Sequence, residues 1–360
     1  MNMYIAVLPG DGIGPEITQQ ALNVMTVVAR RFNHQMHASH ALIGTEAIER
    51  VGTPYPNSTH ALCMESDAVL FGAVGDKRYD DDPTLAVRPK QGLLAMRKNL
   101  GLYANIRPIA LLRAMQHRSP LRKEILESTD FVCVRELTGG LYFGRPQGRS
   151  EDGITAYDTC VYSRMEIERV VDLAFRYAMR RRKKVTIVDK ANVLATSRLW
   201  REVSAQIAKR YPQVTCEFLY VDLAVMRMIQ QPTDFDVIVS CNLFGDILAD
   251  EASALTGAVG MLPSASIGQY TSVFEPTHSA YPQEEGKDLA NPISAILSAA
   301  MMYDYAFGLK RESRFIRQAV SASLNAMIRT VDIQEQGLDP YKTSEVGRWI
   351  CDYLAHEALP

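Results

Sequence analysis

The chain has 360 residues, of which 47% are hydrophobic and 22% are charged, and its formal net charge is −2. That length allows two domains, and the composition is that of a globular protein. The near-neutral charge excludes a polyanion binder as a class, so local arginines must hold any anionic ligand. The sequence shows no basic leader with a cleavage site and no long apolar stretch, which predicts a cytoplasmic protein.

Apolar runs and helical patterns alternate from the first residues onward, which predicts an α/β fold. Met3–Leu8 and Asp67–Phe71 are expected to be buried strands, and Pro15–Arg30 and Gly92–Leu100 are expected to be helices. Gly101 suits the C-terminal cap of the second helix.

A glycine-rich turn, Gly10-Asp11-Gly12-Ile13-Gly14, joins the first strand to the first helix. The position before a helix suits phosphate binding, but the spacing G-x-G-x-G differs from the dinucleotide fingerprint G-x-G-x-x-G. A tight strand–helix turn and a ligand-binding loop therefore remain equally possible at this point.

Three arginines and two leucines suit a small dicarboxylate with an apolar branch. Leu93, Leu94 and Arg97 lie three and four residues apart on one helix, while Arg107 and Arg135 lie on later strands. The alternative is that the leucines are ordinary core residues and the arginines form surface ion pairs.

Further strands are expected in the middle of the chain, at Leu102–Arg107, Phe131–Glu136, Val185–Val188, Cys216–Val221 and Val237–Ser240. Ser163 and Glu166 form a capping box for a long helix that leads into the basic run 180–184. That run is either a nucleic-acid patch or a solvated cationic cluster at a helix end, and the second reading is favoured. The polar stretch 144–162 predicts a loop or a projecting arm.

The cysteines are isolated, since none of the six lies within four residues of another. This spacing argues against a CxxC zinc site or redox pair and predicts buried thiols in a reducing compartment. They are Cys63, Cys133, Cys160, Cys216, Cys241 and Cys351.

Candidate acid–base and metal-binding residues follow the strands. Tyr142 comes after a double glycine and is a candidate proton donor, and Lys190 follows the Val185–Val188 strand and is a candidate base. Asp246 and Asp250 lie four residues apart at the start of an expected helix, and Asp222 follows another strand. Like charges on one helical face are destabilising unless something such as a divalent cation neutralises them. On spacing alone, a solvated pair of acids is as plausible as a metal site.

The order of these motifs resembles the isocitrate/isopropylmalate dehydrogenase family of β-decarboxylating dehydrogenases. The resemblance rests on the opening glycine turn and on three segments, Arg135–Tyr142, Asp189–Val193 and Asn242–Asp250. It implies an α/β, isopropylmalate dehydrogenase-like fold with two domains and a mixed central sheet, not a Rossmann dinucleotide fold. Both chain ends, 1–102 and 257–360, would form a large cofactor-binding domain. Residues 103–256 would form a central domain with the dimer interface and the arm.

The resemblance also implies a homodimer with shared active sites, the cofactor NAD, and Mg²⁺ or Mn²⁺. Arg97, Arg107 and Arg135 would bind the malate carboxylates. Asp222, Asp246 and Asp250 would hold the metal, with Asp222 also contacting substrate. Lys190 would take the hydroxyl proton during hydride transfer, and Tyr142 would protonate the enol left by CO₂ loss. Asp222 and Lys190 would come from the other subunit.

The remaining implied residues recognise the alkyl branch and the cofactor. Leu93, Leu94 and Val193 would contact an isopropyl group. The implied cofactor-binding residues are Ile13, Gly75, Asp76, His278, Ser279, Ala280, Gln283 and Asn291. The implied activity is NAD-dependent oxidation and decarboxylation of (2R,3S)-3-isopropylmalate to 4-methyl-2-oxopentanoate, a step of leucine biosynthesis. The alternatives are a related enzyme of tartrate, malate or homoisocitrate, or a non-catalytic subunit.

Two positions depart from the family pattern. In the cofactor loop the family glycine, alanine and ribose-binding aspartate are replaced by Ser279, Tyr281 and Gln283. Lys90 stands where an acid is usual. Glu284 and Glu285 still oppose a 2′-phosphate by charge, which favours NAD over NADP.

Overall fold

The computed structural model describes residues 1–81, 85–255, 257 and 260–360. The chain divides into two compact units: a terminal unit, Met1–Leu102 with Gly260–Pro360, and a central unit, Tyr103–Val259. The sequence reading ended the central domain at residue 256, and that residue lies outside the described residues. Within the described part of the chain, no helix has the length and apolar character needed to cross a membrane.

The strands of the terminal unit form a mixed sheet. β1 (Asn2–Gly10) pairs in parallel with β2 (Gln35–His40) and with β3 (Ala68–Ala73). β12 (Ser272–Pro276) pairs in parallel with β3 and antiparallel with β11 (Pro263–Gly268). Every residue of β3 is buried, as expected for a continuous apolar run in a parallel sheet. The predicted mixed α/β fold is therefore confirmed in this unit.

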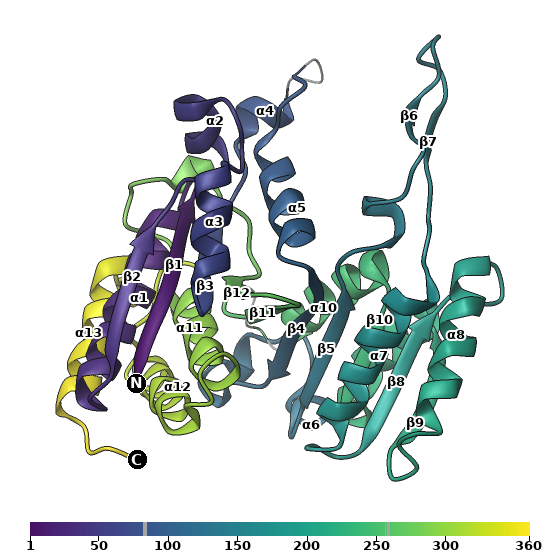
Figure 1. The fold of residues 1–360 in the computed structure, drawn as a ribbon. Helices are drawn as coiled ribbons and strands as arrows, with labels where there is room; N and C mark the ends of the chain where they lie inside the picture. Colours follow the sequence, from purple (N-terminus) through teal and green to yellow (C-terminus); the bar gives the residue numbers. More distant parts are fainter. Residues whose placement is uncertain (82–84, 256, 258–259) are drawn as a thin grey trace. The chain divides into compact units, whose positions relative to one another are not determined.

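Helices from both chain ends pack together in the terminal unit (Figure 1). α11 is the most buried of them, with eleven of its thirteen residues buried, and the Tyr303 hydroxyl on it donates to the Met25 carbonyl of α1 at 2.9 Å. The helices are α1 (Gly14–Arg31), α2 (Thr45–Val51), α3 (Asn57–Glu65), α4 (Lys77–Asp80), α5 (Pro89–Asn99), α11 (Ile293–Tyr305), α12 (Lys310–Asn325) and α13 (Thr343–His356), with the 3₁₀ turn η4 (Pro282–Glu284).

Helix α5 begins three residues earlier than predicted. Pro89 occupies its first position, where a missing N–H costs nothing, and the Gln91 side chain accepts a hydrogen bond from the Arg88 amide at 3.0 Å. Its end is as predicted, because Gly101 has the left-handed φ of +61° and its amide donates to the Lys98 carbonyl at 3.1 Å.

All five strands predicted for the central unit are present. They are β4 (Leu102–Ala110), β5 (Asp130–Glu136), β8 (Lys184–Asp189), β9 (Thr215–Tyr220) and β10 (Val237–Ser240). β5, β10, β8 and β9 are parallel in that spatial order, and β4 is antiparallel to β5. The sheet of this unit is therefore mixed as well, and the carboxyl ends of its four parallel strands share one edge.

The helices of the central unit follow its strands. They are α6 (Lys123–Leu126), α7 (Arg164–Ala178), α8 (Ala195–Ala208), α9 (Val221–Gln230) and α10 (Asn242–Leu255), with the 3₁₀ turns η1 (Arg113–Arg118), η2 (Gly140–Tyr142) and η3 (Pro232–Asp234). The predicted capping box of α7 is confirmed, because the Ser163 hydroxyl accepts from the Glu166 amide and the Glu166 carboxylate accepts from the Ser163 amide.

The polar stretch 144–162 contains a projecting hairpin. β6 (Gln147–Arg149) and β7 (Ala156–Asp158) pair antiparallel, and all six of their residues are exposed. Figure 1 shows the hairpin reaching away from the other strands and helices of the central unit. The predicted arm is therefore present.

The basic run 180–184 has a structural role. Arg181 pairs with Asp130 and Asp236, and Lys184 pairs with Glu217 at 3.0 Å. Arg182 donates to the carbonyls of Asp130 and Phe235. These contacts tie the end of α7 to neighbouring strands, while Arg180, Arg182 and Lys183 are exposed, so the cluster is partly structural and partly solvated.

The prediction that the cysteines are buried is wrong for most of them. Cys63 and Cys133 are buried, Cys160 is exposed, and Cys216, Cys241 and Cys351 are half-buried. All six are free thiols. Burial raises the pKa of the Cys133 thiol to about 12, which makes it unreactive.

Candidate active site

Two carboxylates of helix α10 meet two arginines from neighbouring strands. Asp246 and Asp250 lie one turn apart on this helix, as predicted, while Arg107 comes from β4 and Arg135 from β5. Arg107 donates to Asp250 at 2.8 Å and to Asp246 at 3.3 Å, and Arg135 donates to Asp246 through Nη1. The arginines therefore neutralise the acidic pair, a role that the sequence reading gave to a divalent cation without considering arginines.

Sheet register brings the two arginines to one face. Arg135 lies directly opposite Asn105 in the antiparallel β4–β5 pair, and Arg107 is two residues further along β4. Side chains two residues apart on a strand share a face. Both arginines are buried, with exposed fractions of 7% for Arg107 and 3% for Arg135, so their guanidinium groups lie inside the fold and not on its surface.

The carboxylates retain the character of a site for a hard cation. The Asp250 side chain is 71% exposed and that of Asp246 30%, so both have oxygen atoms that a ligand can reach. Oxygen donors of this kind suit Mg²⁺ or Mn²⁺. The donor set therefore fits a divalent metal, although the two aspartates alone supply fewer than the usual number of ligands.

Tyr142 points at the same carboxylate pair. It ends the turn η2, its hydroxyl donates to Asp246 Oδ2 at 3.3 Å, and the Arg135 guanidinium lies 5.7 Å from its ring centre. Gly140 has a φ of +75°, and a β-carbon there would lie 2.5 Å from the Tyr162 hydroxyl. The double glycine therefore serves close packing of the turn that carries Tyr142.

Lys190 and Asp222 form a second group in the central unit. The Lys190 ammonium donates to Asp222 at 2.7 Å, and this hydrogen bond holds the pKa of the Asp222 carboxyl below its usual range. Asp222 lies in the first turn of α9, and its side chain is 60% exposed. Val193 follows three residues after Lys190 and is 64% exposed.

The predicted three-carboxylate metal site is not assembled within one chain. Among the described residues, no group of three histidine, cysteine or acidic side chains is close enough to hold a metal ion. Asp246 and Asp250 lie together, and Asp222 is paired elsewhere with Lys190.

In the terminal unit, helix α5 presents the other substrate candidates. Leu93, Leu94 and Arg97 are all half-buried, so the two leucines are not ordinary core residues. The Arg97 Nε is buried without a hydrogen-bond partner. Lys90 lies one turn before Leu94, is exposed, and reaches within 3.8 Å of where a Gly75 β-carbon would be. The helix therefore offers two apolar side chains flanked by cations.

The glycine-rich turn has its amides on protein acceptors. The amide of Asp11 donates to Ala73 at 2.7 Å, that of Ile13 to Ala280 at 2.8 Å, and that of Gly14 to Asp11 at 3.0 Å. A β-carbon on Gly12 would lie 2.1 Å from the Ala280 carbonyl oxygen. The tight-turn reading is therefore correct for these amides, and the turn brings two of the predicted cofactor residues together.

Asp11 links this turn to Gly75, a third predicted cofactor-binding residue. Its buried carboxylate accepts the Thr45 amide at 2.8 Å and the Gly75 amide at 3.0 Å, and burial raises its pKa. The neighbouring Asp76 is the N-cap of α4, and its carboxylate is paired with Arg78, which lowers its pKa. Gly75 is thus fixed beside the turn, while the Asp76 side chain is already engaged.

The cofactor loop combines buried and exposed candidates. Burial lowers the pKa of His278, whose Nε2 has no hydrogen-bond partner, while Ser279 and Gln283 are exposed. Tyr281, between them, has a left-handed φ of +43° and is 46% exposed. Further along, Asn291 is buried, accepts the Ile293 amide and donates to Asp332 at 3.0 Å.

The sequence assigned no role to two buried asparagines that hold the arginines. Asn105 Oδ1 accepts from Arg107 Nε at 2.8 Å, and Asn242 Oδ1 accepts from Arg135 Nε at 3.0 Å and Nη2 at 2.8 Å. Two features of the sequence could have indicated these roles: Asn105 lies two residues before Arg107 on the same strand, and Asn242 lies one helical turn before Asp246.

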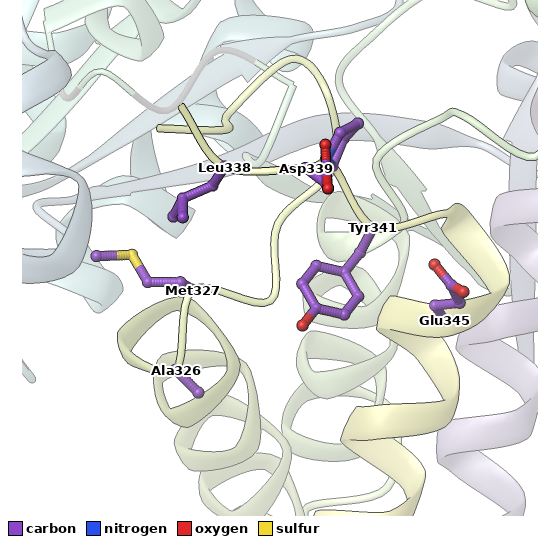
Figure 2. A pocket seen from close by; sticks show the side chains of 7 residues that line it. Ala326, Met327, Leu338, Asp339, Tyr341 and Glu345 are labelled. Atoms are coloured by element: carbon purple, nitrogen blue, oxygen red, sulfur yellow. The ribbon is translucent and has the colours of Figure 1, made fainter. Parts of the chain in front are cut away.

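A separate surface hollow lies at the end of α12, with a volume of about 320 Å³. Figure 2 shows Met327, Leu338 and Tyr341 around it. None of the predicted site residues lines it, so it is not part of the candidate active site.

The chain matches the family model described as isocitrate/isopropylmalate dehydrogenase over residues 4–350. A 3-isopropylmalate dehydrogenase from Bacteroides fragilis is 53% identical over 98% of this chain and 99% of that protein. The protein of the same description from Bacillus subtilis is 49% identical, over 92% of each chain. The sequence resemblance is therefore confirmed over nearly the whole length.

Solved structures of the same family share the fold. An isocitrate dehydrogenase from Methylococcus capsulatus is 33% identical with a TM-score of 0.87, over 98% of this chain and 99% of that one. A β-decarboxylating dehydrogenase from Thermococcus kodakarensis is 32% identical with a TM-score of 0.79, over 97% and 95%. The chain therefore belongs to the isocitrate/isopropylmalate dehydrogenase family of decarboxylating oxidoreductases, which use a nicotinamide cofactor and a divalent metal ion.

Proposed function

We propose that this protein oxidises and decarboxylates (2R,3S)-3-isopropylmalate to 4-methyl-2-oxopentanoate and CO₂, reducing NAD to NADH, in leucine biosynthesis. The observation that carries the proposal is the convergence of Arg107, Arg135 and Tyr142 on Asp246. Relatives named for this activity, at about half identity over nearly the full chain, support the choice of substrate.

The arginines bind the two carboxylates of the malate. Arg107 and Arg135 are buried, permanently charged and fixed from two strands, so they offer preorganised donors to a planar anion. Arg97 adds a third donor from α5, where its buried Nε still lacks a partner.

Proton transfers are assigned to Lys190 and Tyr142. Lys190, which must be the neutral amine for this step, takes the proton of the substrate hydroxyl as the hydride leaves carbon, and Tyr142 returns a proton to carbon after CO₂ departs. The tyrosine hydroxyl is already hydrogen-bonded to Asp246, which keeps it directed at the site. Because one proton is taken and one returned, the reaction needs no net proton.

Asp246 and Asp250, with Asp222 of the partner subunit, would hold Mg²⁺ or Mn²⁺. When bound, the ion supplies Lewis-acid stabilisation of negative charge on the substrate oxygens. The support in this chain is the reachable oxygen atoms of Asp246 and Asp250.

The apolar branch of the substrate meets leucines. Leu93 and Leu94 are half-buried on α5, and Val193 is exposed beside Lys190. Exposed apolar side chains gain from covering an isopropyl group, at roughly 0.8 kcal/mol per buried methylene. An unbranched malate would lose this contribution.

The terminal unit is proposed to bind NAD. The residues would be Ile13, Gly75, Asp76, His278, Ser279, Ala280, Gln283 and Asn291. The hydrogen bonds that join Ile13 to Ala280 and Asp11 to Gly75 support a single site for most of them. Glu284 and Glu285 disfavour the extra phosphate of NADP by charge.

A homodimer is proposed from the exposed apolar faces of two adjacent helices. Leu223, Met226 and Ile229 on α9 and Ile247 on α10 are each at least 41% exposed. Because α9 and α10 pack against each other, these side chains are candidates for one apolar patch, and large exposed apolar patches are typical of interfaces. Asp222 lies on the exposed face of α9, which supports its delivery to a partner's site. The arm β6–β7 would clasp the partner.

The decisive test measures NADH formation with 3-isopropylmalate and Mg²⁺, with NADP in place of NAD, and with EDTA. We expect turnover with NAD that EDTA abolishes, and little with NADP. Tyr142→Phe and Lys190→Met should each lose turnover while remaining folded. A preference for malate, tartrate or homoisocitrate on a matched panel would overturn the substrate assignment. No turnover on any substrate by a folded dimer would favour the non-catalytic alternative.

A further inference from the structure

Asn242 occupies the first position of α10 and is fully buried. Its side-chain oxygen accepts two hydrogen bonds from Arg135, from Nε at 3.0 Å and Nη2 at 2.8 Å. Its side-chain nitrogen donates to the Gly139 carbonyl at 3.2 Å, and its backbone amide donates to the Tyr162 hydroxyl at 2.9 Å. One side chain thus touches both the arginine and the glycine turn.

The partners fix the orientation of this amide. A guanidinium can only donate and a carbonyl oxygen can only accept, so the amide fits in one of its two orientations. The oxygen must face Arg135 and the nitrogen must face Gly139. Glutamine carries the same amide but is one methylene longer, so it would not place both groups at these positions.

The two groups that the Asn242 side chain contacts, Arg135 and the Gly139 turn, both position atoms that bind the Asp246 carboxylate. With Nε and Nη2 held by Asn242, the third nitrogen of Arg135 is directed at Asp246. Gly139 immediately precedes the turn η2, whose last residue, Tyr142, donates to the other oxygen of Asp246 at 3.3 Å. The spacing between arginine and tyrosine is therefore set through Asn242.

We propose that Asn242 is a positioning residue that sets Arg135 and Tyr142 relative to each other around Asp246. The inference rests on the proposed function for the roles of those two residues. It predicts separable effects, because the oxygen of Asn242 serves Arg135, which binds substrate, and the nitrogen serves the Tyr142 turn, which acts in proton return.

The first variant, Asn242→Asp, removes the donor and replaces the neutral amide by a carboxylate that pairs with Arg135. It keeps both acceptor contacts with Arg135 but places a second oxygen against the Gly139 carbonyl, which repels the turn. We expect kcat to fall on the order of 100-fold, as for a reacting group displaced by about 1 Å, while KM for 3-isopropylmalate changes less than about threefold.

The second variant, Asn242→Ala, removes both contacts. We expect a similar loss in kcat and, in addition, a rise in KM of roughly 10-fold, because Arg135 loses two charge-assisted hydrogen bonds. The matched control is Ser323→Ala in α12, which deletes a buried hydroxyl bonded to Val320 at 2.9 Å in the terminal unit. It should lower the melting temperature and leave kcat and KM unchanged.

The outcomes decide between positioning and general stability. Variants that melt earlier but keep wild-type kcat and KM would overturn the proposal, as would an identical kcat and KM change in both. If Asn242→Ala does not fold, Asn242→Asp alone decides through the kcat-against-KM split. If the wild type proves inactive, the proposed function fails, and crystal structures then decide: the Asn242→Asp protein should keep its Arg135 contact and show a displaced 139–142 turn. An unmoved turn would overturn the inference.

Discussion

Two neighbours fix the orientation of Arg135. It is 3% exposed and shares its donors between Asn242 and Asp246. Arg107 is held similarly by Asn105, Asp246 and Asp250. A planar guanidinium can serve several acceptors at once, whereas an ammonium acts as a point charge. The identity of these side chains therefore matters more than their charge.

Replacing Arg135 by lysine should lower kcat/KM for 3-isopropylmalate by about 10- to 100-fold, because the charge remains but the forked contacts are lost. Steady-state NADH formation measures the effect. Arg164→Lys is the control, since Arg164 is exposed and its contacts, with Glu168 at 3.6 Å and with Gln206 at 2.7 Å, lie on the surface of the molecule. Equal activity of the two variants would show that charge alone suffices at position 135.

His278 predicts a pH dependence of stability. Burial lowers its pKa below the ordinary value of 6.5, so the folded protein keeps the ring neutral where the unfolded chain takes up a proton. A depressed folded-state pKa gives stability that is present above pH 6.5 and lost as the pH falls towards the folded value. Urea unfolding of the cofactor-free protein between pH 8 and 5 should show this loss in the wild type.

The His278→Phe variant isolates that effect, because it keeps a ring and removes the titration. As the pH falls below 6.5, the free energy of unfolding should decrease more for the wild type than for the variant. A difference that stays constant over the range would mean that this histidine is accessible enough to protonate in the folded protein.

At the scale of elements, α10 can approach β5 only because of Gly245. A β-carbon at that position would lie 2.9 Å from the Cβ and Cγ atoms of Arg135 and 3.2 Å from its Cα. The glycine therefore carries a helix-propensity cost of about 1 kcal/mol in exchange for close packing against the arginine. The position of Asp246, the next residue, depends on this approach.

Gly245→Ala should destabilise the protein and disturb the site together. The overpacking costs about 1–3 kcal/mol and moves Arg135, so KM for 3-isopropylmalate should rise. The control is Ala254→Gly on the same helix, at an exposed position, which costs about 1 kcal/mol of helix propensity without touching the site. Thermal unfolding and steady-state kinetics of both variants test this. An unchanged KM in Gly245→Ala would show that α10 can move away without cost.

Sequence patterns predicted those elements whose side chains carry a strong apolar signal. Val237–Ser240 was located to the residue, and the arm was recognised by its polarity. β2 was not predicted, because Gln35–His40 is a mostly exposed edge strand with no apolar alternation. β11 was missed for a related reason, since its buried positions include Ser264 and Ser266, whose hydroxyls are satisfied by Glu275.

The sequence allowed the charged residues of the candidate site to be predicted, but not the uncharged residues that hold them in place. Arg107, Arg135 and the aspartates have chemistry that can be read one residue at a time. The roles of Asn105 and Asn242 depend on strand register and on the start of a helix, which only the folded chain defines. The neutralisation of Asp246 by arginines was missed because it joins residues more than a hundred positions apart.

At the scale of the whole molecule, the candidate groups of the central unit fall into two sets. In one set Tyr142 is hydrogen-bonded to Asp246, and in the other Lys190 is hydrogen-bonded to Asp222. The described residues contain no three-carboxylate cluster that would join the sets within one chain. Because α9 and α10 also expose apolar side chains, a dimer in which each site takes one set from each chain accounts for both observations.

Mixing two inactive variants tests this arrangement. Tyr142→Phe and Lys190→Met each remove one set, so each homodimer should be inactive. After dissociation and reassembly, half of the dimers are heterodimers, and in each of these one site is intact and the other lacks both groups. Activity should therefore return to about a quarter of the wild-type level at equal total protein. The double variant Tyr142→Phe/Lys190→Met, mixed in the same way with either single variant, should restore nothing, because no arrangement then yields a complete site. If the two residues act within one chain, neither mixture regains activity, and the shared-site dimer is wrong.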